Sequence, residues 1–285
     1  MKITPGILRI LKSALDEDIG TKDVTTGILF PDNPFVEARL ISKDSCVLAG
    51  IDVFKETFRL LDRRVSFSDF LTDGALLAKG QTAGRIYGPI KAILTGERVS
   101  LNILSRLSGI ATLTSRFVRK AHGRFEILDT RKTTPGLRAL EKYAVRVAGG
   151  KNHRMRMDEM ILIKDNHINA FARLNKISRV DSIAALVSRA KRKARNLKVE
   201  VEVESYSEAM AATKSGADIL MFDNTSALHV KKFLNTVRGR RPVIEVSGGI
   251  TLENISTFYN IPVDYVSIGA LTHSAPAIDF SLEME

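Results

Sequence analysis

The sequence predicts an α/β protein in which a small N-terminal α+β unit is followed by an α/β barrel. After Gly123, short apolar runs recur with helix-length segments between them, and alternating β and α segments form parallel sheets with helices outside. Between residues 35 and 88, in contrast, short β-like runs are broken by glycines and by one helical stretch. The second part contains six apolar runs, fewer than the strands of a closed eight-stranded barrel, so we expect an incomplete barrel.

The N-terminal unit is expected to begin with a helix. Thr4 and Pro5 precede apolar residues at helical spacing, which predicts an N-capped helix that ends near Asp16. From residue 89 to 121 the spacing is again helical, and Gly96 and Gly109 lead us to expect more than one helix there. The intervening segment is expected to contain β-like runs at 36–42, 65–70 and 82–87 and a helix at 51–61.

Each apolar run of the predicted barrel is followed at once by a polar residue or a glycine. Because the carboxyl ends of barrel strands meet at one rim, where catalytic groups of α/β barrels converge, these following residues are candidate site residues. The runs are 125–128, 160–163, 199–203, 218–222, 243–246 and 264–268, and the residues that follow them are Asp129, Lys164, Glu204, Asp223, Ser247 and Gly269.

Composition excludes several classes of protein. The 285 residues are 44% hydrophobic and 26% charged, which is typical of a globular chain rather than a disordered or coiled-coil one. A single cysteine excludes a disulfide framework and favours a reducing, cytoplasmic location. We find neither an apolar run long enough to span a membrane nor a secretory signal peptide. The formal net charge of +11 calls for an anionic partner.

Two strand-end turns are candidates for phosphate binding. Ser247, Gly248 and Gly249 lie between a strand and an expected helix start, and Gly269 opens a similar turn after the last strand. Glycines let backbone N–H groups approach a phosphate, and the loops after the last two strands of α/β barrels often bind one. The alternative is that both segments are only tight strand-to-helix turns.

Cations are concentrated near the first two barrel strands. Between Asp129 and His167 there are nine Lys or Arg residues and five acids, and such a rim suits a ligand with several negative charges. Taken singly, each cation could equally be a surface residue or part of an ion pair. The candidates at the strand ends are Arg131, Lys132, His153, Arg154 and Lys164.

Carboxylates follow on the next strands. Glu202 and Asp223 come from adjacent predicted strands, and paired carboxylates beside a phosphate site suit magnesium or the hydroxyls of a sugar. Glu200, Glu202 and Glu204 alternate along one strand and therefore point the same way. Three acids that face a barrel interior are costly unless a cation such as Lys164 or a metal pairs with them.

These segments together resemble one enzyme family over most of the chain. The motifs are EDIGTKDVTT (17–26), GERVSLN (96–102), LSGIAT (107–112), DTRKTTPGLR (129–138), KNHR (151–154), ILIKDNH (161–167), VEVEVES (199–205), MFDN (221–224), EVSGGI (245–250) and IGALTHSA (268–275). They closely resemble the quinolinate phosphoribosyltransferases, also called nicotinate-nucleotide pyrophosphorylases (carboxylating). The resemblance implies an N-terminal α/β sandwich domain (1–115, to which 272–285 could return), an incomplete TIM-like barrel of six or seven strands (116–271) and a homodimer or a multiple of dimers.

The resemblance also implies a reaction and a set of residue roles. Quinolinate and 5-phosphoribosyl-1-pyrophosphate would react with Mg²⁺ to give nicotinate mononucleotide, pyrophosphate and CO2, a step of de novo NAD biosynthesis. Arg131, Lys132, His153, Arg154 and Lys164 would surround the quinolinate carboxylates and nearby phosphates, and Arg98 would reach into the partner subunit's site. Glu202 and Asp223 would hold the ribose and the Mg²⁺, directly or through the bound donor. Lys132, Lys164, Glu202 and Asp223 are the residues we expect to be catalytic, and Ser247, Gly248, Gly249 and Gly269 would bind the 5-phosphate.

The chain departs from the family pattern around the KNHR motif. Ala148 stands where the family usually has the first of three glycines, Arg156 and Met157 replace a common Gly-Leu, and Glu159 replaces an expected Asp. These departures concern the geometry of the loop between His153 and Lys164, and every matched cation is retained.

Three other functions are open to the sequence. A related transferase that acts on nicotinate, or the transferase-like protein of molybdate operons, is the nearest, although the cation set and the LIKDNH match favour a dicarboxylate. An aldolase could use Lys164 to form a Schiff base. Nucleic-acid binding would rest on the net charge and on the basic run 188–195, but that run is expected to form the solvated face of an outer helix, and aromatic stacking residues are few.

Overall fold

The computed structural model describes residues 1–239 and 241–285 and consists of two compact units. The first contains Met1–Ser115, Thr133–Gly149 and Ala270–Glu285, and the second contains Arg116–Lys132 and Gly150–Gly269. From the sequence, 133–149 is expected to belong to the barrel domain, whereas in the structure this segment groups with the first unit. Its helix α5 (Arg138–Val147) buries Leu140, Ala144 and Val145, and Glu141 of the same helix forms an ion pair with Arg106.

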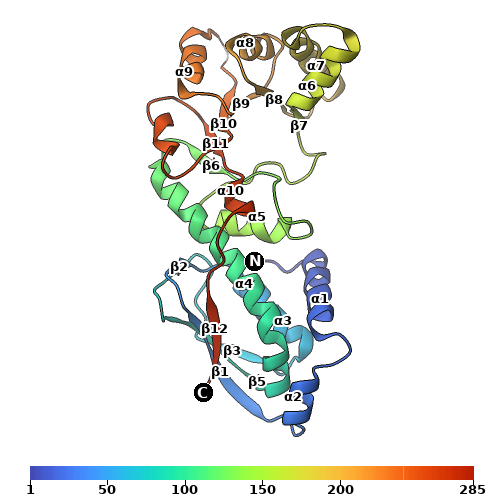
Figure 1. The fold of residues 1–285 in the computed structure, drawn as a ribbon, viewed down its shortest axis with the longest axis vertical. Helices are drawn as coiled ribbons and strands as arrows, with labels where there is room; N and C mark the ends of the chain where they lie inside the picture. Colours follow the sequence, from blue (N-terminus) through green and yellow to red (C-terminus); the bar gives the residue numbers. More distant parts are fainter. Residues whose placement is uncertain (240) are drawn as a thin grey trace. The chain divides into compact units, whose positions relative to one another are not determined.

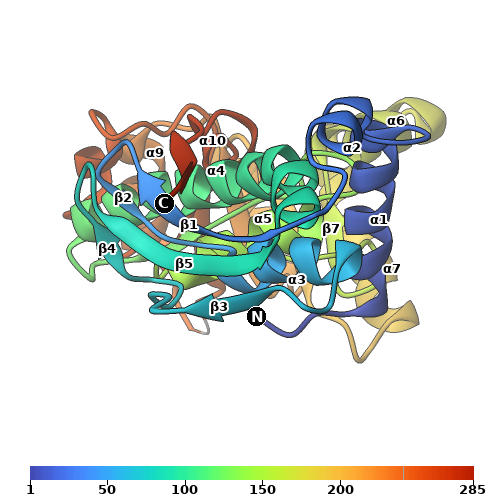
Figure 2. The same cartoon turned by 90° about the horizontal axis from the view of Figure 1, so that it is seen from below.

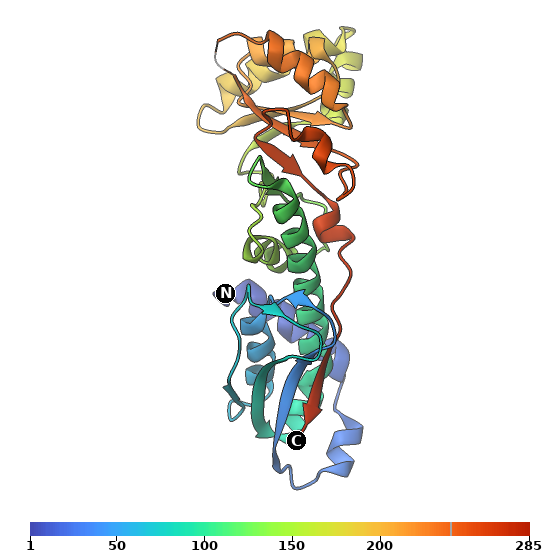
Figure 3. The same ribbon diagram turned by 90° about the vertical axis from the view of Figure 1, so that its left-hand side faces the viewer.

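The first unit is built on a four-stranded antiparallel sheet with the strand order β12–β1–β5–β3. Its strands are β1 (Phe35–Ser42), β3 (Ser66–Ser68), β5 (Thr82–Pro89) and β12 (Phe280–Met284). Figure 2 shows β1, β5 and β3 crossing the view in the foreground. In Figure 3 the red strand β12 lies alongside the blue strand β1, so the last residues of the chain complete a sheet that the first hundred residues begin.

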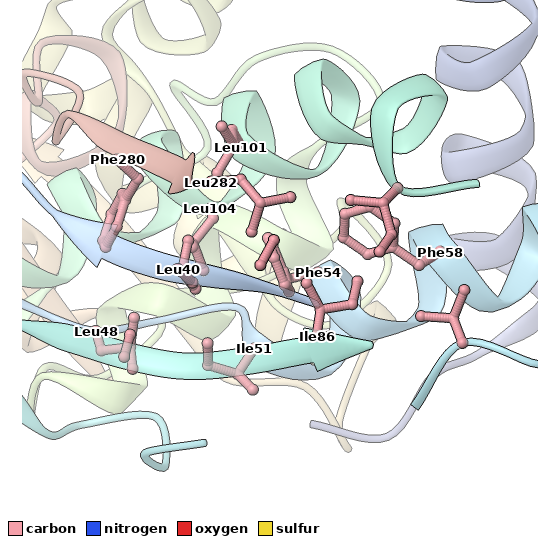
Figure 4. Close-up of a cluster of buried hydrophobic side chains, with 14 of the residues drawn as sticks. Leu40, Leu48, Ile51, Phe54, Phe58, Ile86, Leu101, Leu104, Phe280 and Leu282 are labelled. Atoms are coloured by element: carbon pink, nitrogen blue, oxygen red, sulfur yellow. The ribbon is translucent and has the colours of Figure 1, made fainter. Parts of the chain in front are cut away.

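Helices cover this sheet and enclose an apolar core. α1 (Pro5–Ile19) is capped by the Thr4 hydroxyl, as predicted, and α3 spans Ile51–Leu61. Phe54 and Phe58 of α3 pack edge to face with 5.1 Å between ring centroids. Figure 4 shows these two rings among leucines and isoleucines from the sheet and from α4. The remaining short elements of this unit are α2 (Val24–Leu29), α10 (Ala270–His273) and the paired strands β2 (Cys46–Val47) and β4 (Leu76–Leu77).

Residues 90–121 form one continuous helix, α4 (Ile90–Ala121), and the prediction of more than one helix is wrong. The two glycines that suggested a break provide space instead. A Cβ at Gly96 would lie 2.8 Å from the Phe58 ring, and a Cβ at Gly109 would lie 2.0 Å from the carbonyl oxygen of Pro276. Glycine at these positions therefore allows close packing, which outweighs its low helix propensity.

The second unit contains a six-stranded parallel sheet with the order β6–β11–β10–β9–β8–β7. Its strands are β6 (Glu126–Leu128), β7 (Ile161–Ile163), β8 (Val199–Val203), β9 (Ile219–Asp223), β10 (Val243–Ser247) and β11 (Tyr265–Ser267), which confirms all six predicted runs (Figure 1). A single parallel bridge between Leu128 and Lys151 adds one position beyond β6. This is the incomplete barrel that the sequence predicts.

The helices that follow β7, β8 and β9 in the chain belong to this unit. They are α6 (Asp165–Asn175), α7 (Arg179–Lys193), α8 (Tyr206–Lys214) and α9 (Ala227–Thr236). The basic run 188–195 lies mostly on α7, on a helix outside the sheet as expected. The expected helix start after Gly249 is wrong, because only a short 3₁₀ helix, Ile255–Phe258, follows β10. No helix in the described part of the chain is long and apolar enough to cross a membrane.

Candidate active site

A cavity of 440 Å³ opens at the carboxyl ends of the barrel strands within the second unit. It gathers eight of the twelve predicted site residues into one place. Its lining consists of Thr130, Arg131, Lys132, His153, Arg154, Leu162, Lys164, Asp165, Asn166, Glu202, Met221, Asp223, Glu245, Ser247 and Ser267.

The cations come from three neighbouring segments of the barrel. Arg131 and Lys132 follow β6, and Lys164 follows β7. Arg154 lies three residues after Lys151, which forms a bridge to Leu128 of β6. We call these four residues the positive half of the cavity. Burial lowers the pKa of Arg154, and the nearby charge of Arg131 lowers it further. Arg131 and Arg154 are therefore near enough to repel each other, and Arg154 is partly buried, so an anionic ligand between the two guanidinium groups would be stabilised.

Three acids of the lining come from the other strands, whereas a fourth, Asp165, directly follows Lys164. Glu202 lies in β8, Asp223 ends β9, and Glu245 lies in β10. We call these three residues the acidic half. The acidic half lies on β8, β9 and β10, which are consecutive in the sheet, and the positive half lies at and beside β6 and β7, which are its two edges. The cavity is therefore polarised, with cations on one side and carboxylates on the other.

The halves meet at the boundary between β7 and β8. The Lys164 ammonium lies 3.1 Å from Glu202 Oε1, and the backbone N–H of Asp165 donates to Glu202 Oε2 at 2.9 Å. Both carboxylate oxygens of Glu202 are thus engaged. This ion pair joins one cation of the positive half to one carboxylate of the acidic half.

A buried carboxylate below the rim positions the KNHR loop. Asp129 is fully buried; it accepts one hydrogen bond from the His153 backbone N–H at 2.9 Å and another from Asn152 Nδ2 at 2.6 Å. The Arg154 guanidinium in turn donates to the carbonyl oxygen of Met160 at 2.7 Å. Asp129, which the sequence analysis noted only as a strand-end residue, therefore orients the loop that supplies two of the predicted site residues.

His153 and Glu245, which line the cavity, and the buried Glu200 beside them form a group that we call the floor. His153 Nε2 lies 3.0 Å from Glu200 Oε2 and 3.9 Å from Glu245 Oε2, and both carboxylates are almost fully buried. Glu200 Oε1 and Glu245 Oε1 have no hydrogen-bond partner within the described residues. Burial and the charge of Glu200 raise the pKa of Glu245 to about 8, against an opposite effect of His153.

The floor group has the composition of a metal site, but its hydrogen bonds oppose that interpretation. One imidazole nitrogen and two carboxylate oxygens lie within 4.8 Å of one another. His153 Nδ1, however, accepts a hydrogen bond from the Arg154 backbone N–H at 2.9 Å. A neutral imidazole with an accepting Nδ1 carries its proton on Nε2, which then has no lone pair for a metal. The Nε2–H group donates to Glu200 instead.

The predicted phosphate turns lie beside the cavity, and only Ser247 is part of its lining. Gly248 has a φ of +87°, and a Cβ there would lie 2.3 Å from Asn224 Oδ1. Glycine at this position therefore keeps the turn tight and its backbone open. Gly249 and Gly269 belong to the same two turns.

Arg98 and the residues that depart from the family pattern lie outside the cavity lining. Arg98 is on α4 in the first unit, with a side chain that is 65% exposed. Arg156 is exposed and forms an ion pair with Asp158, and Glu159 accepts a hydrogen bond from the Met155 backbone N–H. Arg156 and Glu159 are thus accommodated by contacts within the loop itself.

Comparisons with known proteins agree with the site. The models of the quinolinate phosphoribosyl transferase N-terminal and C-terminal domains match residues 23–108 and 110–283. A probable nicotinate-nucleotide pyrophosphorylase [carboxylating] of Bacillus subtilis is 41% identical over 97% of this chain and 92% of its own length. One from Archaeoglobus fulgidus is 40% identical over 87% of this chain and 94% of its own.

Solved structures give the same result for the fold. The crystal structure of NadC from Streptococcus pyogenes has a TM-score of 0.92 with 40% identity, and the match covers 100% of this chain and 99% of that chain. Both halves of the sequence and the arrangement of the cavity point the same way. The chain therefore belongs to the quinolinate phosphoribosyltransferase family.

Proposed function

We propose that the protein transfers the phosphoribosyl group of 5-phosphoribosyl-1-pyrophosphate to quinolinate and releases pyrophosphate and CO2, which yields nicotinate mononucleotide for de novo NAD biosynthesis. The polarised cavity is the observation that carries this proposal. Its positive half suits a dianionic pyridine acid, and its acidic half suits a ribose that develops positive charge at the anomeric carbon.

In this proposal the positive half binds quinolinate. Arg131 and Arg154 offer forked donors for carboxylates, whereas Lys132 and Lys164 act as compact charges. His153 lines the same wall, but its two ring nitrogens are occupied by Glu200 and by the Arg154 backbone. We therefore assign His153 to holding the wall in place, with contact to the substrate through the ring surface.

The acidic half binds the donor. Glu202 and Asp223 are placed to contact the ribose hydroxyls, and their charge stabilises an oxocarbenium-like transition state. Mg²⁺, when bound, would neutralise the charge of the leaving pyrophosphate. The donor set fits this ion, because Asp223 is a hard oxygen ligand on the cavity wall and Mg²⁺ is usually held by one or two carboxylates together with substrate phosphates. One oxygen of Glu202 forms an ion pair with Lys164 and the other accepts a hydrogen bond from the Asp165 backbone, so we assign Glu202 to the ion mainly through the bound donor.

The 5-phosphate belongs at the two turns after β10 and β11. Ser247 offers a hydroxyl at the cavity wall, and at Gly248 a Cβ would lie 2.3 Å from Asn224 Oδ1, so only glycine fits in the turn that follows it. Gly249 lies in the same turn, and Gly269 lies in the turn after β11. Since no α-helix starts directly after the first turn, the backbone amides rather than a helix dipole would hold the phosphate there.

Decarboxylation needs an acceptor for an electron pair. Once the ring nitrogen forms its bond to the anomeric carbon, the neighbouring carboxylate can leave as CO2, and the electron pair of the broken C–C bond stays on the ring carbon, where the adjacent positive nitrogen stabilises it. A proton from solvent then completes the C–H bond of the product, so the reaction requires neither pyridoxal phosphate nor thiamine. The residues of the cavity need only align the weakly nucleophilic nitrogen with the sugar.

The proposal includes a homodimer in which Arg98 reaches the site of the partner subunit, and a cytoplasmic location that the single, buried Cys46 supports. Arg98→Ala and Lys164→Ala, each inactive alone, should recover partial activity when co-expressed as mixed dimers. If purified heterodimers stay inactive, the shared site is wrong.

Product analysis tests the reaction directly. Purified protein with quinolinate, phosphoribosyl pyrophosphate and Mg²⁺ should yield nicotinate mononucleotide and CO2, whereas nicotinate in place of quinolinate should yield far less product. Lys132→Ala and Arg154→Ala should mainly raise the KM for quinolinate, and Asp223→Ala should mainly impair use of the donor. Unchanged kinetics in all three variants would refute the assignment of the site.

A further inference from the structure

Arg179 lies outside the cavity lining, yet it connects two elements that build the cavity. It is the first residue of α7, and its side chain is 29% exposed. Its guanidinium donates to Asp165 Oδ1 at 2.6 Å and to Glu208 Oε1 at 2.9 Å, and it lies 3.6 Å from Glu204 Oε2. Three carboxylates from different segments thus converge on one cation.

Each of these contacts continues to a residue of the site. Asp165 begins α6 directly after Lys164, and its backbone N–H donates to Glu202. Glu208 accepts a hydrogen bond from the Glu204 backbone N–H at 2.9 Å, directly beyond the end of β8. Arg179 therefore holds both the turn that presents Lys164 and the strand end that presents Glu202.

The geometry of the contact favours arginine over lysine. A planar guanidinium presents several donors in a fixed geometry, so one side chain can bind carboxylates from different directions. The hydrogen bonds to Glu208 and Asp165 raise the pKa of Arg179 above its usual range. Without this cation, the carboxylates of Asp165, Glu204 and Glu208 would repel one another and drive α6 away from β8.

We propose that Arg179 is a positioning residue for the reaction, which sets the geometry of the Lys164–Glu202 pair from outside the cavity. The expected effect of Arg179 on kinetics rests on the proposed function. Its expected effect on the Lys164–Glu202 contact rests on the contacts alone. In this proposal Arg179 keeps Lys164 of the positive half aligned with Glu202 of the acidic half.

The kinetic test compares Arg179→Gln with Arg179→Lys and with Lys191→Gln. Lys191 is a matched control, because it lies near the other end of α7 and pairs with Asp218 at 2.8 Å, at the amino end of β9 and away from the cavity. A displacement of about 1 Å at a catalytic group can reduce turnover about 100-fold. We expect a loss of this order in kcat/KM for Arg179→Gln, partial recovery in Arg179→Lys, and unchanged kinetics in Lys191→Gln at a similar melting temperature. Equal activity of Arg179→Gln and Lys191→Gln would overturn the proposal.

A double-mutant cycle distinguishes positioning from a general loss of stability. If Arg179 acts through Glu202, Arg179→Gln should reduce kcat/KM much less in a Glu202→Gln background than in the wild type. Losses that multiply independently would overturn the proposal.

Crystal structures of the wild type and of Arg179→Gln supply a readout that does not depend on activity. The Lys164–Glu202 contact should lengthen or break in the variant, and an unchanged contact would overturn the positioning role. If the wild type fails to form nicotinate mononucleotide, the proposed function fails, while this structural comparison still decides the role of Arg179.

Discussion

The floor of the cavity makes the stability of the protein depend on pH in a predictable direction. Glu245 and Glu200 are both buried, and the only N–H of the His153 ring lies closer to Glu200, at 3.0 Å against 3.9 Å. Glu245 is thus the carboxyl that keeps a proton in the folded state, in agreement with its raised pKa. In the unfolded chain the same group ionises near its ordinary pKa.

The sign and size of the effect follow from this difference. The folded protein binds more protons than the unfolded chain between the two pKa values, so the contribution of Glu245 is fully present below pH 4.5 and is lost as the pH rises toward 8. At about 1.4 kcal/mol per pKa unit, the whole interval corresponds to about 5 kcal/mol. Rearrangement around the buried pair reduces this value, and we expect about 3 kcal/mol between pH 5 and pH 8.

Glu245→Gln tests this reasoning, because glutamine keeps the shape of the protonated acid and cannot ionise. The variant should match the wild type near pH 5 and become more stable than it toward pH 8, by about 6 °C in melting temperature at about 2 °C per kcal/mol. Circular dichroism during heating, at several pH values, measures the difference.

Glu253→Gln is the control for the floor variant. Glu253 is exposed, and hydrogen bonding to Thr251 lowers rather than raises its pKa, so its removal should act weakly and in the opposite direction. Parallel pH curves for the wild type and Glu245→Gln would show that Glu245 is ionised in the folded protein and that our description of the floor is wrong.

Three further substitutions test the site and the fold. Glu202→Gln removes the charge that pairs with Lys164, so quinolinate alone should bind more tightly by calorimetry while use of the donor falls; weaker binding would contradict the ion-pair exchange. Asp129→Asn replaces one carboxylate oxygen with an NH2 group, which would face the N–H group of His153 or of Asn152 and break one of the two hydrogen bonds that orient the loop. The KM for quinolinate should rise about tenfold, and an unchanged KM would count against this role of Asp129. Gly109→Ala places a Cβ 2.0 Å from the Pro276 oxygen and should destabilise the fold by about 3 kcal/mol in urea unfolding, whereas a neutral result would disprove the close approach.

The barrel strands could be predicted from the sequence because each is a short apolar run between helix-length segments. All six runs became strands, and three of the residues that follow them, Lys164, Asp223 and Ser247, line the cavity. The break in residues 90–121 was predicted wrongly for a physical reason, since the glycines there are required by neighbours that are distant in sequence. Phe58 and Pro276 approach α4 so closely that only glycine fits, and a local pattern contains no information about such contacts.

The floor of the cavity shows a second limit of sequence reasoning. Glu245 was missed because it lies inside a strand, two residues before the rim, where a charged residue has no local signal of its role. The available clue was chemical: an acid within an otherwise apolar run must have a partner, and the same clue applied to Glu200. Only the structure shows that both acids turn toward His153.

The separation of charges in the cavity follows from the order of residues along the chain. In a parallel βα array, strands that are consecutive in sequence tend to be neighbours in the sheet, and β7, β8, β9, β10 and β11 are neighbours here. Cations that are grouped early in this part of the sequence and acids that are grouped later must therefore occupy different arcs of the rim. The cations share one arc although β6 and β7 are opposite edges of the sheet, because Lys151 forms a bridge to Leu128 of β6. This bridge brings Arg131 and Lys132, which follow β6, near Arg154, which precedes β7. The Lys164–Glu202 ion pair lies at the boundary between the two arcs. In the proposed reaction, a substrate pair that separates these two side chains would replace their contact with contacts to quinolinate on one side and to the ribose on the other.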